Sequence, residues 1–412
     1  MRSVLVVLAN LEFWIVLALV GVSVASQNFL IWAVAGIVLY IPIRRIGQGR
    51  WSIPTTADFA ILGLIVMSII ALLVTPSMEV SLPQVLRLWS GIGLFYAVVN
   101  MDGKKGMRWM VLLLCLIGIG LVVVAPAGVS WPVAKLAFLK FNSLAKFPHR
   151  MADTINPNVL GGYLAFFIPI PLAVVGLGWR KLRWWESIFY LASALLMGAM
   201  LLLTQSRGAL LALGLGLLFM VVLLWRWGWI LIALVGALMA GMVLRLGVFQ
   251  FGQAVINAGG GLSSLQGRVE IWQKALWLIQ SYPFSGSGMG LYGKLVDTFL
   301  PLLGSEAGSA PHAHNIFLQV AVDLGVPGLV AWLAVFLFVL RSAWQVFRQE
   351  KKLSWLAGLG LGIVVSQVVL ALDGLTDAVT WGMVRPAPLV WLVWGLAFAA
   401  QRMTLPAQHF EE

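Results

Sequence analysis

The segment His312-Ala313-His314-Asn315 is the densest polar cluster in the chain and holds two of its 4 histidines. Asn315 precedes an apolar stretch that ends near Asp323, and it is predicted to cap a short helix there. His314 then lies at a helix N-terminus, where unpaired N–H groups and the helix dipole favour anions. A neutral imidazole in this position can act as a general base near pH 7.

Metal binding is the alternative for this histidine pair. A zinc site needs at least one further Cys, His or carboxylate ligand. His149 falls in a different loop and His409 lies in the C-terminal tail, so the sequence shows no third ligand close to the pair. The number of ligands therefore favours a base, and no metal ion is expected.

Two arginines occupy polar segments beside apolar stretches. Arg207, in Thr204-Gln205-Ser206-Arg207-Gly208, is predicted at the mouth of two membrane helices, where its charge remains effective; a positional anchor in a tight turn is the alternative. Arg268 opens a predicted helix that runs to about Ile279 in the membrane interface, and a functional and an ordinary surface role are equally open for it. The predicted apolar face of this helix consists of Val269, Trp272, Ala275, Leu276 and Ile279.

The segment 282–290 is rich in glycine, and glycine-rich backbone can hold phosphate. It lacks a Walker pattern, and no strand precedes it. A flexible connection is therefore the favoured interpretation.

Several further polar residues are weaker candidates for substrate contacts. They are His312, Asn315, Arg150, Arg87 and Asp323. Arg150 could meet phosphate or a lipid headgroup, Arg87 could line a cavity or snorkel outward from its apolar stretch, and Asp323 could orient a histidine or cap the next helix. Asp373 and Asp377 bracket a polar turn, for which a salt bridge to Arg385 is the simple explanation.

These residues must be held by membrane-spanning helices. Of the 412 residues, 61% are hydrophobic and 10% are charged, whereas a soluble domain has about 25% charged residues. The apolar stretches have the length of about 20 residues that a helix needs to cross a bilayer, and 20 Trp suit the membrane interface. The net charge of +12 does not indicate a nucleic-acid partner, because the basic residues separate the apolar stretches instead of forming a patch. The single Cys115 excludes an internal disulfide.

The expected fold is all-α, with about twelve transmembrane helices, and the first apolar stretch is interpreted as a retained span and not a signal peptide. The spans are predicted near 4–24, 28–43, 57–74, 82–99, 109–125, 157–177, 186–204, 208–225, 228–246, 327–347, 354–373 and 386–401. The chain is accordingly divided into helices 1–5 (1–125), a loop (126–156), helices 6–9 (157–246), a large loop with interfacial helices (247–326), helices 10–12 (327–401) and a tail (402–412).

Most of the 27 Lys and Arg residues fall in alternate loops on one side of these spans, together with both termini. Cytoplasmic loops carry this excess of positive charge. Both termini are therefore predicted to be cytoplasmic, and both long loops, with the candidate reactive residues, are predicted to face outward.

The motifs resemble the O-antigen ligase and polymerase superfamily, and most closely O-antigen ligase. The resemblance rests on the segments around Arg207, Arg268 and the 282–290 glycines, on Asn156-Pro157-Asn158, and above all on His314-Asn315 followed after nine residues by Gly325-Val326-Pro327-Gly328. It covers roughly residues 150–346.

This resemblance implies a metal-independent, inverting glycosyltransferase of the C-type without a cofactor, in the bacterial inner membrane. Its members take a glycan from an undecaprenyl-diphosphate carrier and pass it to an acceptor hydroxyl, such as that of the lipid A core, on the outer face. By position, Arg207 and Arg268 would bind the diphosphate, and His314 would activate the acceptor or assist at the same centre. The partners would be this donor, a lipid or glycan acceptor and membrane lipids.

Three alternatives remain at this point. A polysaccharide polymerase and a protein O-oligosaccharyltransferase would use the same donor and an outer site. A solute transporter is disfavoured, because the sequence shows no internal repeat and its polar residues do not gather at the membrane midplane.

Overall fold

The computed structural model describes residues 2–101, 104–129, 131, 155–247, 265–299, 310–349 and 354–404, which form helices and no β-strand. This confirms the predicted all-α polytopic class. The first helices are α1 (Arg2–Asn10), α2 (Glu12–Ala25), the short η1 (Gln27–Phe29), α3 (Leu30–Gln48), α4 (Asp58–Val74), α5 (Met78–Val99) and α6 (Lys104–Gly128). They are followed by α7 (Pro157–Phe167), α8 (Pro169–Gly178), α9 (Trp184–Thr204), α10 (Arg207–Leu224), α11 (Trp229–Leu246), α13 (Leu265–Ser281), α14 (Tyr292–Phe299), α15 (Ile316–Gln349), α16 (Trp355–Gly374) and α17 (Pro388–Thr404).

Each of the twelve predicted spans coincides with helical residues in the described part of the chain. Eight helices are long and apolar enough to cross a membrane. The pair α1 and α2, which bends by 59° at Leu11, raises the number to nine if it counts as one span. Helices α4 and α11 are apolar but shorter, so the number twelve stays a prediction.

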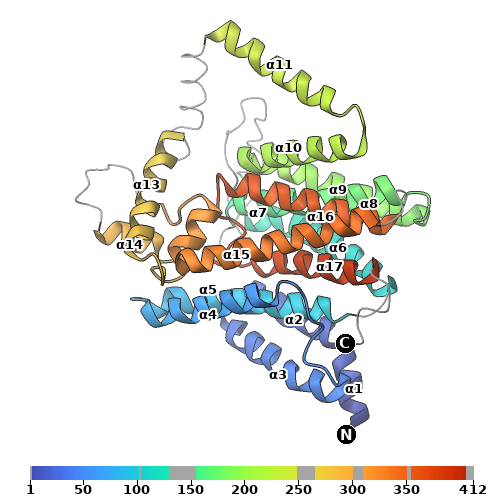
Figure 1. The fold of residues 1–412 in the computed structure, drawn as a ribbon, viewed down its shortest axis with the longest axis vertical. Coiled ribbons are helices and arrows are strands. Elements are labelled where there is room, and N and C mark those ends of the chain that lie inside the picture. The colour runs from blue at the N-terminus through green and yellow to red at the C-terminus, as the bar shows by residue number, and fades with distance from the viewer. Residues whose placement is uncertain are drawn as a thin grey trace.

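The centre of the bundle consists of α15, α16 and α17 with α5, α7 and α8 packed around them (Figure 1). Most residues of α16 and α17 are buried, which requires apolar side chains on all sides of a helix. Trp332 and Trp394 join α15 to α17 with ring centroids 6.1 Å apart. In contrast, none of the described side chains of α11 is buried, and this helix stands apart from the bundle (Figure 1).

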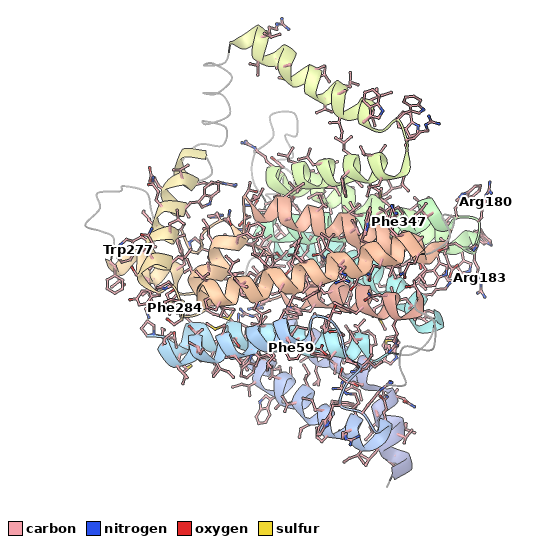
Figure 2. The ribbon with its side chains drawn as sticks, viewed as in Figure 1. Phe59, Arg180, Arg183, Trp277, Phe284 and Phe347 are labelled. Carbon is pink, nitrogen blue, oxygen red and sulfur yellow. The ribbon has the colours of Figure 1, made fainter. Side chains whose placement is uncertain are left out.

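The bundle has two distinct ends. Arg180 and Arg183 lie at one end, and Trp277 and Phe284 lie at the other, which we call the α13 end (Figure 2). Helix α13 runs across this end at a steep angle to α15, as an interfacial helix would (Figure 1).

The predicted apolar face of α13 was wrong in part. Its buried side chains are Ile271, Ala275 and Leu278, whereas Val269 and Leu276 are 40% and 48% exposed. The buried face is set by tertiary contacts, because it packs on α14 and α15, and sequence periodicity alone does not give their direction.

The segment 283–290 is packed against α15, so its interpretation as a flexible connection was wrong. Gly325 breaks α15 with a left-handed φ of 72°. On either side of this kink the segment pairs with the α15 backbone, with Ser287 N donating to Val322 O (2.8 Å) and Val326 N donating to Pro283 O (2.7 Å). A Cβ atom on Gly286 would lie 2.5 Å from the carbonyl oxygen of Asp323, so only glycine permits this approach.

Candidate functional site

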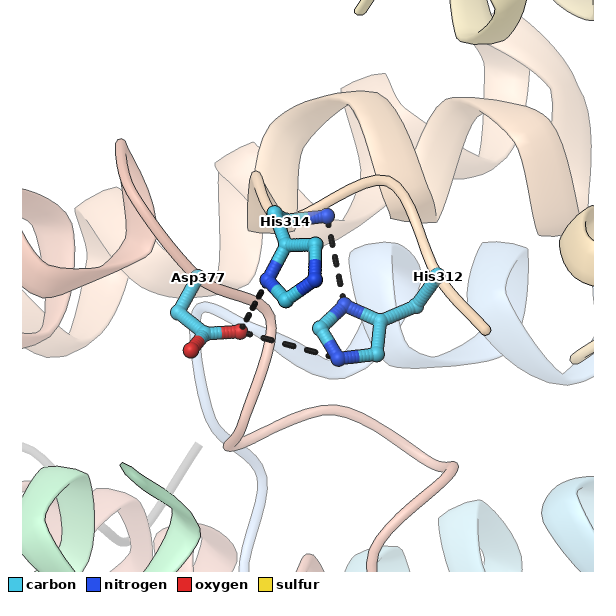
Figure 3. A group of neighbouring side chains, drawn as sticks. All are labelled: His312, His314 and Asp377. Atoms are coloured by element: carbon cyan, nitrogen blue, oxygen red, sulfur yellow. Dashed lines mark hydrogen bonds and ion pairs between the residues drawn. The ribbon is translucent and has the colours of Figure 1, made fainter. Parts of the chain in front are cut away.

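His312 and His314 face the carboxylate of Asp377 at the α13 end (Figure 3). The distance from His314 Nδ1 to Asp377 Oδ1 is 3.2 Å, and that from His312 Nε2 to the same oxygen is 3.7 Å. The two imidazole rings contact each other, with centroids 4.0 Å apart. The side chain of His314 is 22% exposed and those of His312 and Asp377 are 14% and 8% exposed, so His314 is the most open of the three to a ligand.

The hydrogen bonds assign the protons of this group. A carboxylate only accepts, so His314 Nδ1 carries a hydrogen and donates it to Asp377. In the neutral ring, His314 Nε2 is then a proton acceptor, as in the aspartate–histidine pairs that orient a general base. The backbone N–H of His314 donates to His312 Nδ1 at 3.2 Å, so neutral His312 carries its hydrogen on Nε2, toward Asp377.

The charges in the group follow from burial and contacts. Burial lowers the pKa of His312 to about 4; the Asp377 carboxylate opposes this shift, and His314 and Arg268 add to it. Burial raises the pKa of Asp377, but the hydrogen bond from His314 and the charges of both imidazoles outweigh this, and the pKa stays below its usual range. Near pH 7 His312 is therefore neutral and Asp377 is ionised.

Asn315 fixes the backbone that carries His314. Its Oδ1 accepts hydrogen bonds from the N–H groups of Phe317 and Leu318, both at 3.0 Å, which confirms that it caps the helix. Its Nδ2 donates to Leu375 O at 3.2 Å, in the turn that leads to Asp377. His314 itself has a left-handed φ of 45°, which a residue other than glycine keeps only where its surroundings impose it. Asn315 therefore positions the His314 imidazole. Its bonds are all to protein backbone, so they do not support the predicted contact of Asn315 with substrate.

The first turn of α7 holds Asp377 from the other side. Asn156 caps α7 by accepting a hydrogen bond from Asn158 N at 2.8 Å. Pro157 occupies the first turn, where its fixed φ suits the helix. The Asn158 side chain donates to Asp377 Oδ2 at 3.3 Å, and Ala378 N donates to Asp377 Oδ1 at 2.9 Å. The Asn-Pro-Asn motif thus starts a helix and orients the carboxylate.

Arg207 begins α10 after Ser206, and the residue before Ser206, Gln205, has a left-handed φ of 53°. Its side chain is exposed. The next residue, Gly208, is so close to the turn before Asp377 that a Cβ atom on it would lie 2.7 Å from Thr376 Oγ1. The N-terminus of α10, with its favourable field for anions, therefore adjoins the turn that carries Asp377.

Arg268 lies in the first turns of α13 and is half-buried. Its charge contributes to the lowered pKa of His312, so it is near enough to act on this group electrostatically. Segments that carry Arg207, Arg268 and His314 are thus assembled at one end of the bundle from distant parts of the sequence.

Two of the weaker candidates have structural partners. Arg87 is buried in α5, and its Nη1 donates to the carbonyl oxygens of Gly382 (3.0 Å) and Met383 (3.2 Å), in the loop after Asp377. We therefore assign Arg87 to holding this loop. Asp323 is fully buried and receives three hydrogen bonds from protein groups. Arg150 lies outside the described residues.

Asp377 is the residue whose interaction partner was predicted wrongly from the sequence. The proposed salt bridge to Arg385 explained it locally, but its observed partners are the two histidines and Asn158. The sequence signal for this contact was weak: a carboxylate in a polar turn predicted to lie at the same membrane face as the histidines.

The sequence argument against a metal ion was that the histidine pair lacks a third ligand, and Asp377 provides one. One donor atom each from His312, His314 and Asp377 lie within 4.8 Å of one another. Three protein ligands are enough for a catalytic zinc ion. The same three residues are also consistent with an arrangement without a metal ion, since Asp377 Oδ1 accepts a hydrogen bond from His314 at 3.2 Å and lies 3.7 Å from His312 Nε2.

Fold and site define the class as a multi-pass helical membrane protein with a His–Asp pair and arginine-bearing segments at one end of its bundle. Residues 192–333 match the family model of O-antigen ligase; this range contains Arg207, Arg268 and His314 and ends before Asp377. The chain is 28% identical over 260 residues to an O-antigen ligase of Pseudomonas aeruginosa, and the aligned part covers 60% of each protein. These matches confirm the predicted resemblance to the O-antigen ligase superfamily.

Proposed function

We propose that this protein transfers a glycan from an undecaprenyl-diphosphate carrier to an acceptor hydroxyl. The observation that carries the proposal is the hydrogen bond of 3.2 Å between His314 and Asp377, beside the segments that bear Arg207 and Arg268. The match to O-antigen ligase favours ligation to a lipid acceptor over polymerisation of glycan repeats. A test is transfer by the purified protein in proteoliposomes that contain only this donor and a lipid A core acceptor.

In the proposed reaction His314 Nε2 takes the proton of the acceptor hydroxyl as its oxygen attacks the anomeric carbon. The ionised Asp377 stabilises the imidazolium that forms. The bond between the anomeric carbon and the diphosphate oxygen breaks on the opposite face, so the configuration inverts. The electron pair leaves with the undecaprenyl diphosphate.

The arginines act on the leaving group. Negative charge grows on the diphosphate as the glycosidic bond breaks, and cationic donors fixed beside it lower the barrier. Arginine suits this task because its planar guanidinium pairs with two oxygens and stays charged. The energy for transfer comes from the activated carrier, so no nucleotide is needed.

We propose that the reaction takes place on the outer face, and cysteine labelling tests this orientation. In a background without Cys115, Ser281→Cys at the α13 end should react with a membrane-impermeant maleimide in intact spheroplasts. Lys181→Cys, which is also at an exposed position but at the opposite end, should react only after permeabilisation. The reverse pattern would place the site in the cytoplasm.

We expect transfer without a metal ion, because protein hydrogen bonds satisfy Asp377. Treating the purified protein with EDTA should leave the transfer rate unchanged, with the metal content measured before and after. If chelation stops transfer and zinc restores it, His312, His314 and Asp377 are metal ligands and the base mechanism is wrong.

A further inference from the structure

The carboxylate of Asp323 is hydrogen-bonded to the loop that carries Asp377 and, through Gln319, is linked to the loop that carries His314. Its Oδ1 accepts from Gly290 N and from Gln319 Nε2, both at 2.9 Å. Its Oδ2 accepts from Trp381 Nε1 at 2.8 Å. Asp323 and Gln319 are 0% exposed and Trp381 is 3% exposed, so these bonds form away from solvent, where an unsatisfied partner is costly.

One chain of bonds runs from Asp323 to the histidines. While Gln319 Nε2 donates to Asp323, Gln319 Oε1 accepts from the backbone N–H of Ala313 at 2.8 Å. Ala313 lies between His312 and His314 and is 0% exposed. Gln319 therefore fixes the peptide group between His312 and Ala313, directly before His314.

A second chain of bonds runs from Asp323 to the loop that carries Asp377. Trp381 lies four residues after Asp377 in the same short loop. Its backbone N–H donates to Ala378 O at 3.2 Å. The bond from the Trp381 indole to Asp323 holds this loop against α15. Both chains converge on one carboxylate, so the two loops cannot shift independently while the bonds persist.

We infer that Gln319 and Asp323 are positioning residues that keep His314 and Asp377 within hydrogen-bonding distance of each other. This inference rests on the proposed function. Both side chains are fully buried and bonded to protein groups: Asp323 accepts three hydrogen bonds, and the Gln319 amide uses its nitrogen and its oxygen. The substrate-binding role predicted for Asp323 is replaced by this one.

The test compares Gln319→Met with Gln345→Met. Methionine keeps the length of glutamine and removes its hydrogen bonds. Gln345 is a matched control on the same helix, since it is bonded to Gln401 at the opposite end of α15. In proteoliposomes, Gln319→Met should lower kcat about 10- to 100-fold with little change in the donor KM, because misplacement acts on the chemical step. Gln345→Met should keep the wild-type kcat.

A double-mutant cycle separates positioning from a general effect on the fold. If Gln319 acts through the His314–Asp377 pair, Gln319→Met should cost much less in an Asp377→Asn background than in the wild type. An equal cost in both backgrounds, or a wild-type kcat for Gln319→Met, overturns the inference. Should Gln319→Met not insert, Trp381→Phe tests the other chain of bonds, because it keeps an aromatic side chain at this position and removes the indole N–H donor.

Hydrogen exchange provides a readout that needs no activity. In detergent, the peptide over residues 310–315 should exchange faster in Gln319→Met than in Gln345→Met, because the Ala313 amide loses its acceptor. Unchanged exchange overturns the inference even if wild-type transfer is normal. If the peptide exchanges faster in Gln319→Met but the wild-type protein transfers no glycan, the positioning bonds are supported and the proposed function is refuted.

Discussion

A His314→Ala variant should transfer glycan at least about 100-fold more slowly than the wild type, since general bases contribute this much or more to such reactions. The variant lacks the imidazole whose Nδ1 is held by Asp377 at 3.2 Å and whose Nε2 faces the acceptor in the proposed reaction. The measurement is the initial rate in proteoliposomes at saturating donor and acceptor, normalised to inserted protein.

His312→Gln is the matched control for this variant. His312 is also partly buried beside Asp377, but at 3.7 Å, and its Nδ1 accepts a hydrogen bond from the backbone N–H of His314. The Gln side chain can supply an acceptor for that N–H, so a much smaller loss is expected. Equal losses in the two variants, or full activity of His314→Ala, would show that the imidazole at 314 is not the base.

Arg207→Ala should lower kcat by about 100- to 1000-fold, the usual cost of removing one donor that stabilises transition-state charge. The exposed arginine stands at the α10 N-terminus, beside the turn that carries Asp377, so it can reach a ligand bound at His314. Arg207→Lys should recover only part of the rate, because an ammonium keeps the charge but loses the paired geometry.

Arg245→Ala controls for loss of positive charge at this end of the bundle. Arg245 lies in the last turn of α11, which returns to the same end as the first turn of α10. Its removal should leave kcat unchanged at equal protein levels. If both arginine variants lose the same activity, the charge acts through the membrane surface; if Arg207→Ala is fully active, Arg207 does not bind the diphosphate.

Much of the fold follows from hydropathy, because a span in lipid must be apolar and helical over its whole length. This is why the twelve apolar stretches all coincide with helices. Local signals were also reliable: Asn315 and Asn156 cap helices through contacts with residues two or three positions away. The buried face of α13 was less predictable, since it depends on where α14 and α15 lie.

The site was predictable only where the chain itself places residues together. His312 and His314 are two positions apart, so the sequence alone places them in one cluster. Asp377 is 63 positions from His314, and Arg87 reaches Gly382 across 295 positions. Hydropathy assigns such residues to a membrane face but does not pair them, so the carboxylate partner and the role of Arg87 emerge only from the packed bundle.

The kink at Gly325 has a consequence for how α15 responds to the bilayer. A break in a helix leaves backbone groups unpaired, but here Val322 O and Val326 N are bonded to the segment before α14. The two turns that follow His314 are therefore joined to the layer formed by α13 and α14, while the remainder of α15 belongs to the bundle. We therefore expect changes in helix tilt with bilayer thickness to be taken up beyond Gly325, so that the imidazole keeps its position relative to α13 and α14.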